Sequence, residues 1–479
     1  MTRPVPLLLL LAGLLFFFAL GSHELQGSTE ARVAGIAMAM HLDNDWVIPR
    51  LFREPFLEKP PLSLWLDAGA IRLFGGTTWA VRLASAFAGL FSVMLFYGML
   101  RKFGRPKTMA FCAALILATM ASYWGNVRGV GEDSLLSLGV TTALLAFYQA
   151  MRPESERQGS NAWAWALFTV GMAIATLSKG VLGLAMPGIV IFVYLVSTSV
   201  MDKRLRIGDW LKPGLFTLLA LVPLLIWLGF LFQRGGMQAV AEVLWTNSVG
   251  RFSGSFVEAG HYEPIYYYIA KLPEAFLPWN ILVYLGLWHF RKSLVRNRYR
   301  LFFSVWLVAQ FTLLTLASSK RVVYLMALTP AAAVLAAEYA GVLLEWLKAH
   351  KPALYRYHRG VISGVFTLLI ASYMTAAFWF APKADLRESF VPVISQAKAY
   401  QTEGKEVVLF QPNERIAGAS VFYLQGYLPI LQTEAELRSF LAAKPGNMAL
   451  LGRTEQLAEK VTVIKEMAIG RQPYYFVEQ

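Results

Sequence analysis

The chain has little charge and almost no cysteine. Of its 479 residues, 15% are charged and 56% are hydrophobic, and the mean hydropathy is +0.48. A soluble protein of this length could not bury so much apolar surface, so the composition predicts that a bilayer solvates most of the chain. The single cysteine, Cys112, lies in an apolar run, which excludes an intramolecular disulfide and leaves the redox compartment open.

The sequence also lacks a Walker loop and a dinucleotide fingerprint, so we do not expect it to use a nucleotide. Its net charge of +14 would suggest a nucleic-acid partner in a soluble protein. Here Lys and Arg gather in short loops between apolar runs, as the cytoplasmic loops of membrane proteins require. We therefore expect the membrane as a partner and no nucleic acid.

About eleven apolar runs, each of roughly 17–23 residues, are long enough to span a bilayer. They begin near Val5, Trp79, Lys107, Asp133, Asn161, Gly180, Pro213, Leu272, Leu301, Val322 and Val361. The first run could instead be a signal peptide, since Arg3 precedes an apolar core that ends in Ala19-Leu20-Gly21. The inside and outside assignment of the other loops is consistent when the first run is kept as a span and not cleaved, which favours a transmembrane helix.

The basic residues set the orientation. With the N-terminus inside, the inner loops hold most of the positive charge, at Arg101, Lys102, Arg105, Lys107, Arg152, Arg157, Lys203, Arg204, Arg206, Lys212, Arg291, Lys292, Arg296, Arg298, Arg300, Lys348, Lys351, Arg356 and Arg359. The outer loops are longer and poorer in positive charge. This pattern predicts a multi-pass inner-membrane protein.

Three outer segments, at about 22–78, 234–271 and 382–479, are too long for simple connections. In the first, Val33, Ile36, Ala37 and Met40 share one helical face, which suits a helix lying in the membrane interface. The third alternates short elements: strands at Glu406–Gln411, Ser420–Leu424, Ala449–Leu451 and Val461–Lys465, and a helix at Glu434–Ala443. We predict an all-α polytopic membrane domain, residues 1–381, and a small α/β domain outside the membrane, residues 382–479.

The sharpest chemical signal is Glu58-Lys59-Pro60-Pro61 in the first outer segment. The two prolines fix an extended, rigid backbone, because each restricts its own φ and the residue before it. A lysine held at head-group level suits a lipid phosphate as a point charge. The alternative is a surface lysine whose head reaches water beside a turn.

Other ionisable residues of the outer loops each have a structural alternative, such as helix capping, a tight hairpin or an interfacial aromatic belt. They are Glu30, Arg32, Arg128, Glu132, Asp133, Lys179, Arg251, His261, Lys320 and Arg321, with Tyr324 beside the last two. One topology sends all of them to the same membrane face, where charge is costly. This layout is expected for a site that takes a phosphate-bearing lipid.

The motifs resemble the membrane glycosyltransferases of the GT-C fold, in the branch with the lipid A 4-amino-4-deoxy-L-arabinose transferase and the protein O-mannosyltransferases. The resemblance runs from about Ser28 to Pro330. The matching stretches, in family order, are Glu30-Ala31-Arg32, Asp45-Trp46 before Pro49, Glu58-Lys59-Pro60-Pro61, Arg82-Leu83, Asp133 with Leu135, Leu177-Ser178-Lys179-Gly180, His261 with Pro264 and Tyr267, Leu277-Pro278-Trp279, and Lys320-Arg321 with Tyr324 and Pro330. The Glu-Lys-Pro-Pro stretch in a first outer loop is specific to this group.

The resemblance implies a GT-C-like membrane domain and a donor sugar carried on polyprenyl phosphate, most simply undecaprenyl phosphate. The sugar would pass, with inversion, to a periplasmic-side acceptor such as lipid A, another glycolipid or a protein. The family's acidic pair in the first loop is usually Asp-Glu, whereas this chain has Thr29-Glu30. Either Glu30 takes the role of the missing aspartate or the activity is altered. Phe56 also stands where the family often has Tyr.

We expect cations to stabilise the departing phosphate and a carboxylate to take the acceptor's proton. The phosphate-binding candidates are Lys59, Arg32, Arg251, Lys320, Arg321 and Tyr324, and the catalytic candidates are Glu30 and Asp133. No cofactor is certain, although Glu58 and His261 could hold a divalent metal ion. Two other classes stay open: a transporter or flippase for lipid-linked sugars, and a non-catalytic assembly protein.

Overall fold

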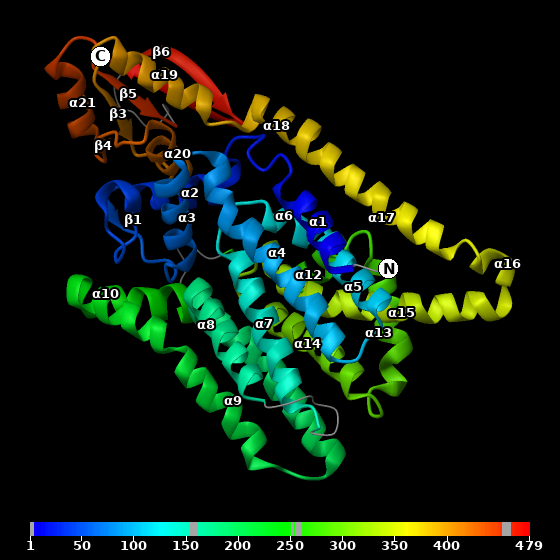
Figure 1. Cartoon of the computed structure of the whole chain (residues 1–479). Coiled ribbons are helices and arrows are strands. Elements are labelled where there is room, and N and C mark those ends of the chain that lie inside the picture. The colour runs from blue at the N-terminus through cyan, green and yellow to red at the C-terminus, as the bar shows by residue number, and fades with distance from the viewer. Residues whose placement is uncertain (1–3, 154–160, 251–252, 254–260, 453–460) are drawn as a thin grey trace. The chain divides into compact units, whose positions relative to one another are not determined.

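The computed structural model describes residues 4–153, 161–250, 253, 261–452 and 461–479 (Figure 1). The chain divides into two compact units. We call the first the helical unit; it comprises Met1–Phe18, Leu57–Leu62 and Ser85–Tyr373. We call the second the mixed unit; it comprises Ala19–Phe56, Ser63–Ala84 and Met374–Gln479.

The described part of the helical unit is built from helices. They are α1 (Pro4–Phe17), most of α4 (Thr78–Lys102), α5 (Lys107–Ala118), α6 (Ala121–Val127), α7 (Asp133–Met151), α8 (Ala162–Asp202), α9 (Ile207–Ala220), α10 (Val222–Ala241), η2 (Glu242–Gly250), α12 (Tyr267–Ala275), α13 (Asn280–Phe290), η3 (Arg291–Ser293), α14 (Arg298–Leu316), η4 (Val322–Leu328), α15 (Thr329–His350), α16 (Pro352–Tyr355) and most of α17 (His358–Thr375).

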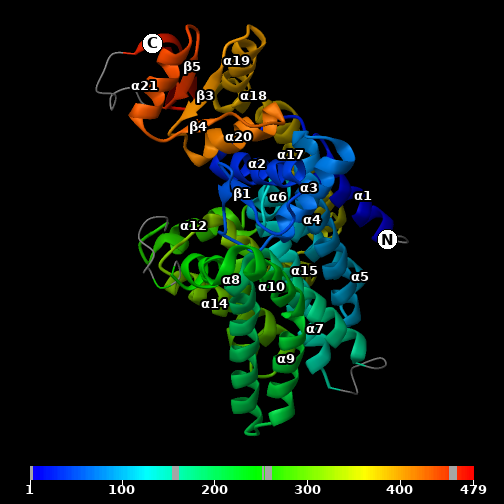
Figure 2. The ribbon, with the colours of Figure 1, turned by 90° about the vertical axis from the view of Figure 1, so that its left-hand side faces the viewer.

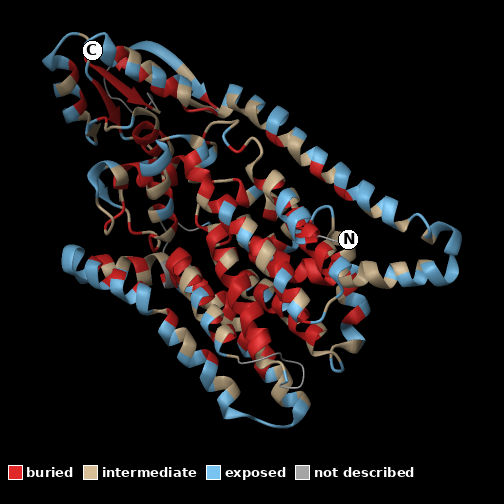
Figure 3. Ribbon diagram, in the orientation of Figure 1, coloured by how far each residue is buried: buried red, intermediate tan, exposed pale blue. Residues whose placement is uncertain are grey.

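Within the described residues, seven helical stretches are long and apolar enough to cross a membrane, and α5 with α6, bent by 65°, would make an eighth. Many apolar residues of α9 and α10 are exposed, for example Leu215, Leu218 and Leu225. Much of these two helices has the colour of exposed residues in Figure 3. Lipid tails are the natural solvent for such surfaces. The chain is therefore a mostly helical, multi-pass membrane protein, and the count of eleven spans stays a prediction.

The 41 residues of α8 are about twice what one span needs. The helix is interrupted at Lys179 and Gly180, where the backbone leaves helical geometry. Just beyond the break the chain returns against its own first leg, because a Cβ on Gly183 would lie 2.0 Å from the carbonyl oxygen of Ala175. The tight hairpin that the sequence allowed at Lys179-Gly180 is thus present.

The mixed unit combines helices with two small sheets. Its elements are α2 (Gly27–Asp43), β1 (Arg50–Leu51), β2 (Glu54–Pro55), most of α3 (Leu62–Phe74), the start of α4, η5 (Ala376–Phe380), α18 (Ala381–Glu388), α19 (Val391–Thr402), β3 (Val407–Phe410), α20 (Glu414–Leu424), β4 (Ile430–Leu431), α21 (Glu434–Ala443), β5 (Met448–Leu451), β6 (Thr462–Ile469) and β7 (Gln472–Glu478).

Five strands form the larger sheet, in the order β4-β3-β5-β7-β6. Strand β3 pairs in parallel with β4 and β5, whereas β7 runs antiparallel to β5 and β6. Helices α19 and α20 pack on one face through Ile394 and Ile416, and α21 packs on the other through Leu437 (Figure 2). The α/β character predicted for the C-terminal segment is confirmed.

The predicted strand at Ser420–Leu424 is wrong, because these residues belong to α20. Asn413 starts this helix: its side chain accepts a hydrogen bond from the backbone amide of Ile416. A short apolar run looks the same in a buried strand and in a buried helix, so periodicity alone could not separate them.

The interfacial helix expected in the first outer segment exists as α2, but its apolar residues do not face lipid. Val33, Ile36, Ala37 and Met40 are all buried. Helix α2 packs against α20 at very short range, since a Cβ on Gly35 would lie 2.4 Å from Cα of Gly418. The amphipathic pattern therefore reflects packing within the mixed unit.

Candidate functional site

Two lysines of the helical unit meet one buried carboxylate. Nζ of Lys59 lies 2.5 Å from Oε1 of Glu132, and Nζ of Lys179 lies 3.1 Å from the same oxygen. Lys179 also pairs with Asp133, and Lys59 lies 3.8 Å from Glu58. Three stretches that the sequence singled out, Glu58-Lys59, Glu132-Asp133 and Lys179, are thus brought together. We call this group, with Arg321 and Tyr324, the ion-pair cluster.

The rigid Pro-Pro stretch positions Lys59. Pro60 and Pro61 are buried, and the carbonyl oxygen of Leu57 accepts a hydrogen bond from Nδ2 of Asn247 at 3.2 Å. The backbone on both sides of Lys59 is therefore held within the unit. Its side chain keeps 17% of its surface exposed, so the lysine stands at the edge of the cluster rather than inside it.

The break in α8 positions Lys179. At Gly180 the backbone has φ 53° and ψ −125°, a conformation that side-chain-bearing residues rarely adopt. The helix is interrupted at Lys179, and there the lysine side chain contacts Glu132 and Asp133 at the start of α7. The lysine side chain is only 4% exposed. A buried ammonium needs partners, and Glu132 and Asp133 supply them.

Burial opposes a charge on Glu132, whose side chain is 3% exposed, but the cations outweigh it. Lys179, then Lys59 and Arg321, hold the pKa of Glu132 well below its usual range. The glutamate is therefore an ionised anchor for the cations and not a proton acceptor. Asp133, with 11% of its side chain exposed, is the more accessible carboxylate.

Arg321 and Tyr324 complete the ion-pair cluster. The carboxylates of Asp133, Glu132 and Glu58 all act electrostatically on Arg321. The ammonium of Lys179 lies 4.5 Å from the ring centre of Tyr324. Together the group holds three cations, Lys59, Lys179 and Arg321, and three carboxylates. Lys179 is buried and paired with Glu132 and Asp133, whereas Lys59 and Arg321 are partly exposed.

Tyr268 is a residue whose role the sequence did not reveal. Its side chain is fully buried, and its hydroxyl accepts from the backbone amide of Arg321 at 3.0 Å and donates to the carbonyl of Arg321 at 3.1 Å. The tyrosine therefore clamps the backbone that carries Arg321. It lies in a run of three tyrosines, which the sequence could equally explain as an interfacial belt.

Lys320 and His261 lie close to Arg321 in the chain or in space, and they form hydrogen bonds with backbone groups and Ser319. Nζ of Lys320 donates to the carbonyls of Ala317 and Glu263, at 2.6 and 3.0 Å, and the lysine is 5% exposed. The backbone of His261 bonds to Lys320 and to the side chain of Ser319. Across the described ranges, no three His, Cys, Asp or Glu side chains are grouped as metal ligands. A metal at Glu58 and His261 stays a prediction.

Arg128 lies in the same unit but secures α1. Its guanidinium donates to the carbonyls of Leu15, Phe16 and Phe18, at 3.2, 3.2 and 2.9 Å. It thereby satisfies carbonyl groups at the end of that helix, which have no partner within the helix. Arg251, the remaining cation predicted for this unit, lies outside the described residues.

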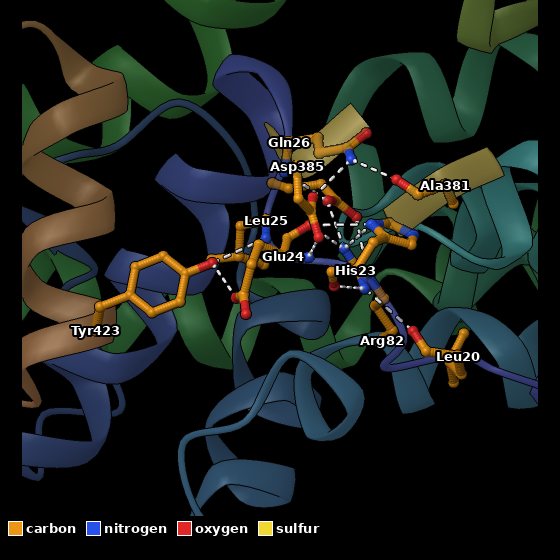
Figure 4. Close-up of polar contacts among 10 residues, drawn as sticks. Leu20, His23, Glu24, Leu25, Gln26, Arg82, Ala381, Asp385 and Tyr423 are labelled. Carbon is orange, nitrogen blue, oxygen red and sulfur yellow. Dashed lines mark hydrogen bonds and ion pairs between the residues drawn. The ribbon is translucent and has the colours of Figure 1, made fainter. Parts of the chain in front are cut away.

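Glu30 belongs to the mixed unit, where it pairs with Arg82. The guanidinium of Arg82 is fully buried, and its nitrogens lie 3.2 and 2.9 Å from the two carboxylate oxygens of Glu30. The same guanidinium donates to the carbonyls of Leu20, His23 and Glu24 (Figure 4). Arg82 thus organises the start of the first outer segment. The sequence singled out Arg82 only as part of the Arg82-Leu83 stretch, and its charge inside an apolar helix was a further signal that it has a buried partner.

This buried group is extended by Asp385 and Tyr423. Asp385 accepts from the backbone amide of Glu24 and the side chain of Gln26, and the Tyr423 hydroxyl donates to Glu24 at 2.8 Å (Figure 4). Burial first, and then the charge of Arg82, lower the pKa of His23. Arg32 pairs with Glu414 at 2.8 Å. In this unit Glu30 and Arg32 therefore have structural partners.

The ion-pair cluster can bind an anion at its exposed edge while its inner charges stay balanced. A phosphate at that edge can contact Lys59 and Arg321 where they stand, while Glu132 keeps Lys179 as its partner. A carboxylate beside them, Asp133, can accept a proton from a hydroxyl. Cations for a leaving phosphate and a nearby base are what transfer from a lipid phosphate requires.

Residues 58–227 match the family described as dolichyl-phosphate-mannose-protein mannosyltransferase. The undecaprenyl phosphate-alpha-4-amino-4-deoxy-L-arabinose arabinosyl transferase of Pseudomonas aeruginosa is 28% identical over 323 residues, 67% of this chain and 56% of that protein. The corresponding transferase 2 of Proteus mirabilis is 29% identical over 342 residues, 70% of this chain and 58% of that protein.

The fold is shared with a solved relative. The crystal structure of ArnT from Cupriavidus metallidurans bound to undecaprenyl phosphate matches with a TM-score of 0.75 and 19% identity, covering 100% of this chain and 98% of that chain. The resemblance predicted from the motifs is confirmed by the family match, the curated transferases and the solved structure. The alignments with the two curated transferases span 56% and 58% of those proteins, less than two thirds of their length.

Proposed function

We propose that this chain, which shares the fold of ArnT, is an inverting glycosyltransferase that takes a sugar from polyprenyl phosphate. The single observation that carries this proposal is the convergence of Lys59 and Lys179 on Glu132, with Asp133 alongside. The alignment with transferases named for an undecaprenyl phosphate-linked sugar supports the same class of donor.

The donor phosphate is bound by Lys59 and Arg321, the partly exposed cations of the ion-pair cluster. As the bond between sugar and phosphate breaks, negative charge accumulates on the phosphate oxygens. Fixed cations stabilise that charge without having to reorganise. Tyr268 acts through Arg321, since it holds the backbone of that residue by two hydrogen bonds.

Asp133 is the proposed general base. It takes the proton of the acceptor hydroxyl as the hydroxyl oxygen attacks the sugar, which yields a single displacement with inversion. Lys179 positions Asp133 by pairing with it. Glu30, the other catalytic candidate, is paired with the buried Arg82, and this pairing favours a structural role for it.

The acceptor is a periplasmic-side molecule such as lipid A, another glycolipid or a protein. In this proposal the chain lies in the bacterial inner membrane with its site facing the periplasm. Residues 1–381 form the transmembrane transferase domain, with about eleven spans, and residues 382–479 form an α/β domain outside the membrane. The excess of Lys and Arg in alternate loops supports this orientation.

The test uses the full-length protein in detergent micelles with radiolabelled undecaprenyl-phosphate sugars. Micelles have no inside or outside, so a flippase has no product to form, whereas a transferase still breaks the bond between sugar and phosphate. We expect free undecaprenyl phosphate to accumulate as label moves to a lipid A or protein acceptor. Intact donor throughout, with a protein that is folded and fully inserted, would favour a transporter or an assembly protein.

A further inference from the structure

A hollow of about 520 Å³ lies in the mixed unit, apart from the ion-pair cluster. It is lined by Phe410, Gln411, Pro412, Asn413, Ile416, Glu434, Leu450, Leu451, Gly452, Gln472 and Tyr474. Its volume falls in the range of small-molecule sites, roughly 300–1,000 Å³. None of the residues that the proposed transfer reaction uses lines it.

The hollow lies where the topology of the sheet reverses. The chain leaves β3 through α20 to reach β4 on one side, then passes through α21 to β5 on the other side of β3. The lining residues Phe410, Leu451 and Gly452 stand at the carboxyl ends of β3 and β5. In open α/β sheets, ligands bind in the crevice outside these ends, at the switch point.

The polar lining is rich in groups that recognise hydroxyls. Asn413, whose Nδ2 donates to the Tyr474 hydroxyl at 3.3 Å, stands at the start of α20. Tyr474 is 1% exposed, and within the described ranges the proton of its hydroxyl has no acceptor. The amide side chain of Gln472 likewise has no hydrogen-bond partner among the described residues. Tyr474 is buried and Gln472 is partly exposed at the hollow, and polar groups with unused hydrogen-bonding capacity on a concave surface can orient a ligand.

The charges of the lining indicate which ligand fits. No Lys or Arg is among the described residues that line the hollow, and its one charged side chain is Glu434, which pairs with Arg438 at 3.3 Å. The lining itself therefore supplies no cation to compensate a phosphate or carboxylate ligand, and Arg415, which acts electrostatically on Tyr474, is outside the lining. Amides, a phenol and the apolar faces of Phe410 and Ile416 suit an uncharged ring that carries hydroxyl groups on its edge.

We propose that the hollow at the carboxyl ends of β3 and β5 binds an uncharged pyranose ring, and that this ring belongs to the acceptor. The assignment to the acceptor rests on the proposed transferase function, whereas binding of the ring does not. The contacts would come from Asn413, Gln472 and Tyr474. The C-terminal segment would then be a saccharide-binding part of the enzyme.

The test measures binding of methyl β-D-glucopyranoside to the full-length protein in nanodiscs by saturation-transfer difference NMR. The key variant is Gly452→Leu, because a Cβ there meets Gln472 and Tyr474 at ordinary contact distances of 3.7 and 3.8 Å. The added side chain occupies the part of the hollow beside Gln472 and Tyr474 without displacing the backbone. The matched control is Gly426→Leu, in the same unit but outside the lining, where the one neighbour of a Cβ among the described residues is the carbonyl oxygen of Leu424, 3.8 Å away.

We expect binding to wild type and to Gly426→Leu, and its loss in Gly452→Leu. Tyr474→Phe should weaken binding by up to about tenfold, the value of one hydrogen bond. Equal binding by Gly452→Leu and wild type would overturn the proposal, as would the absence of binding to wild type. Displacement of the glycoside by inorganic phosphate would overturn the uncharged class of ligand.

Kinetics separate this proposal from the proposed function. In Gly452→Leu the KM for the acceptor should rise while the KM for the donor stays unchanged; a rise confined to the donor would overturn the assignment to the acceptor. Sugar transfer by wild type without glycoside binding would refute the proposed binding site and leave the proposed transferase function intact. Glycoside binding without any turnover of the donor would refute the proposed transferase function and leave the proposed binding site intact.

Discussion

Nζ of Lys59 lies 2.5 Å from Oε1 of Glu132, although one residue follows the first outer segment's β-hairpin and the other precedes α7. Lys179 reaches the same oxygen from the turn of α8. One buried carboxylate therefore ties three separate parts of the helical unit together. Its two cationic partners differ in exposure, at 17% for the Lys59 side chain and 4% for the Lys179 side chain. Lys59 is therefore accessible to a ligand, whereas Lys179 stabilises the buried carboxylates.

Lys179→Met should destabilise the protein strongly. It leaves the buried Glu132 and its neighbour Asp133 with one cation fewer, and breaking a buried ion pair typically costs about 3–5 kcal/mol. Because Lys59 still lies beside Glu132, we expect a value at the low end. Thermal unfolding of the purified protein in detergent measures the change.

Glu132→Gln combined with Lys179→Met provides the control, because it removes one charge of each sign. The double variant should recover part of the lost stability. If it is as unstable as the sum of the two single variants, the two residues do not interact as the geometry requires.

Gly180→Ala tests the break in α8. A residue with a Cβ is strained at φ 53°, ψ −125°, at a cost of roughly 1–3 kcal/mol. We expect lower stability and lower turnover, since Lys179 would be displaced from Asp133. Gly188→Ala, in the second leg of the same helix and with open space around its Cβ, should be neutral or slightly stabilising. Equal effects of the two substitutions would contradict this role of Gly180.

His23 should make the stability of the mixed unit depend on pH. Burial and Arg82 lower its pKa in the folded protein, so below about pH 6.5 the unfolded chain binds a proton that the folded chain resists. Stability should therefore be constant above this pH and fall as the pH drops toward the lowered pKa. The melting temperature, recorded from pH 7.5 down to pH 5.5, measures the slope.

His23→Gln should flatten that slope, because the substituted side chain does not titrate. The exposed His350 supplies the comparison, and His350→Gln should leave the slope as in wild type. An unchanged slope in His23→Gln would mean that other groups cause the pH dependence.

Much of the site was predictable because its residues carry charge where charge is expensive. Glu58, Lys59, Glu132, Asp133, Lys179, Arg321 and Tyr324 were all singled out from spacing and topology, and the structure brings them together. What spacing cannot give is the partner of each residue. Lys320 and Arg321 are neighbours in the sequence, yet the first bonds to backbone carbonyls while the second faces carboxylates.

The fold was predictable where the pattern was long, as in the apolar helices, and failed where it was short. Ser420–Leu424 lies in α20 because of a helix start at Asn413 that a five-residue window does not contain. The apolar face of α2 was assigned to lipid because a sequence does not show that Gly35 and Gly418 meet. The first error comes from a local start signal outside the window, and the second from a contact between segments far apart in the chain.

The most direct test of the central claim is the rate of sugar transfer from undecaprenyl phosphate in Lys59→Ala and Lys271→Ala. Lys59 belongs to the ion-pair cluster, whereas Lys271 is 41% exposed and pairs only with Glu274 among the described residues. We expect Lys59→Ala to lower the rate by about 10²–10³-fold, as loss of one group that stabilises a developing anion does, with folding preserved. Lys271→Ala should match wild type. Equal rates in the two variants would contradict the site.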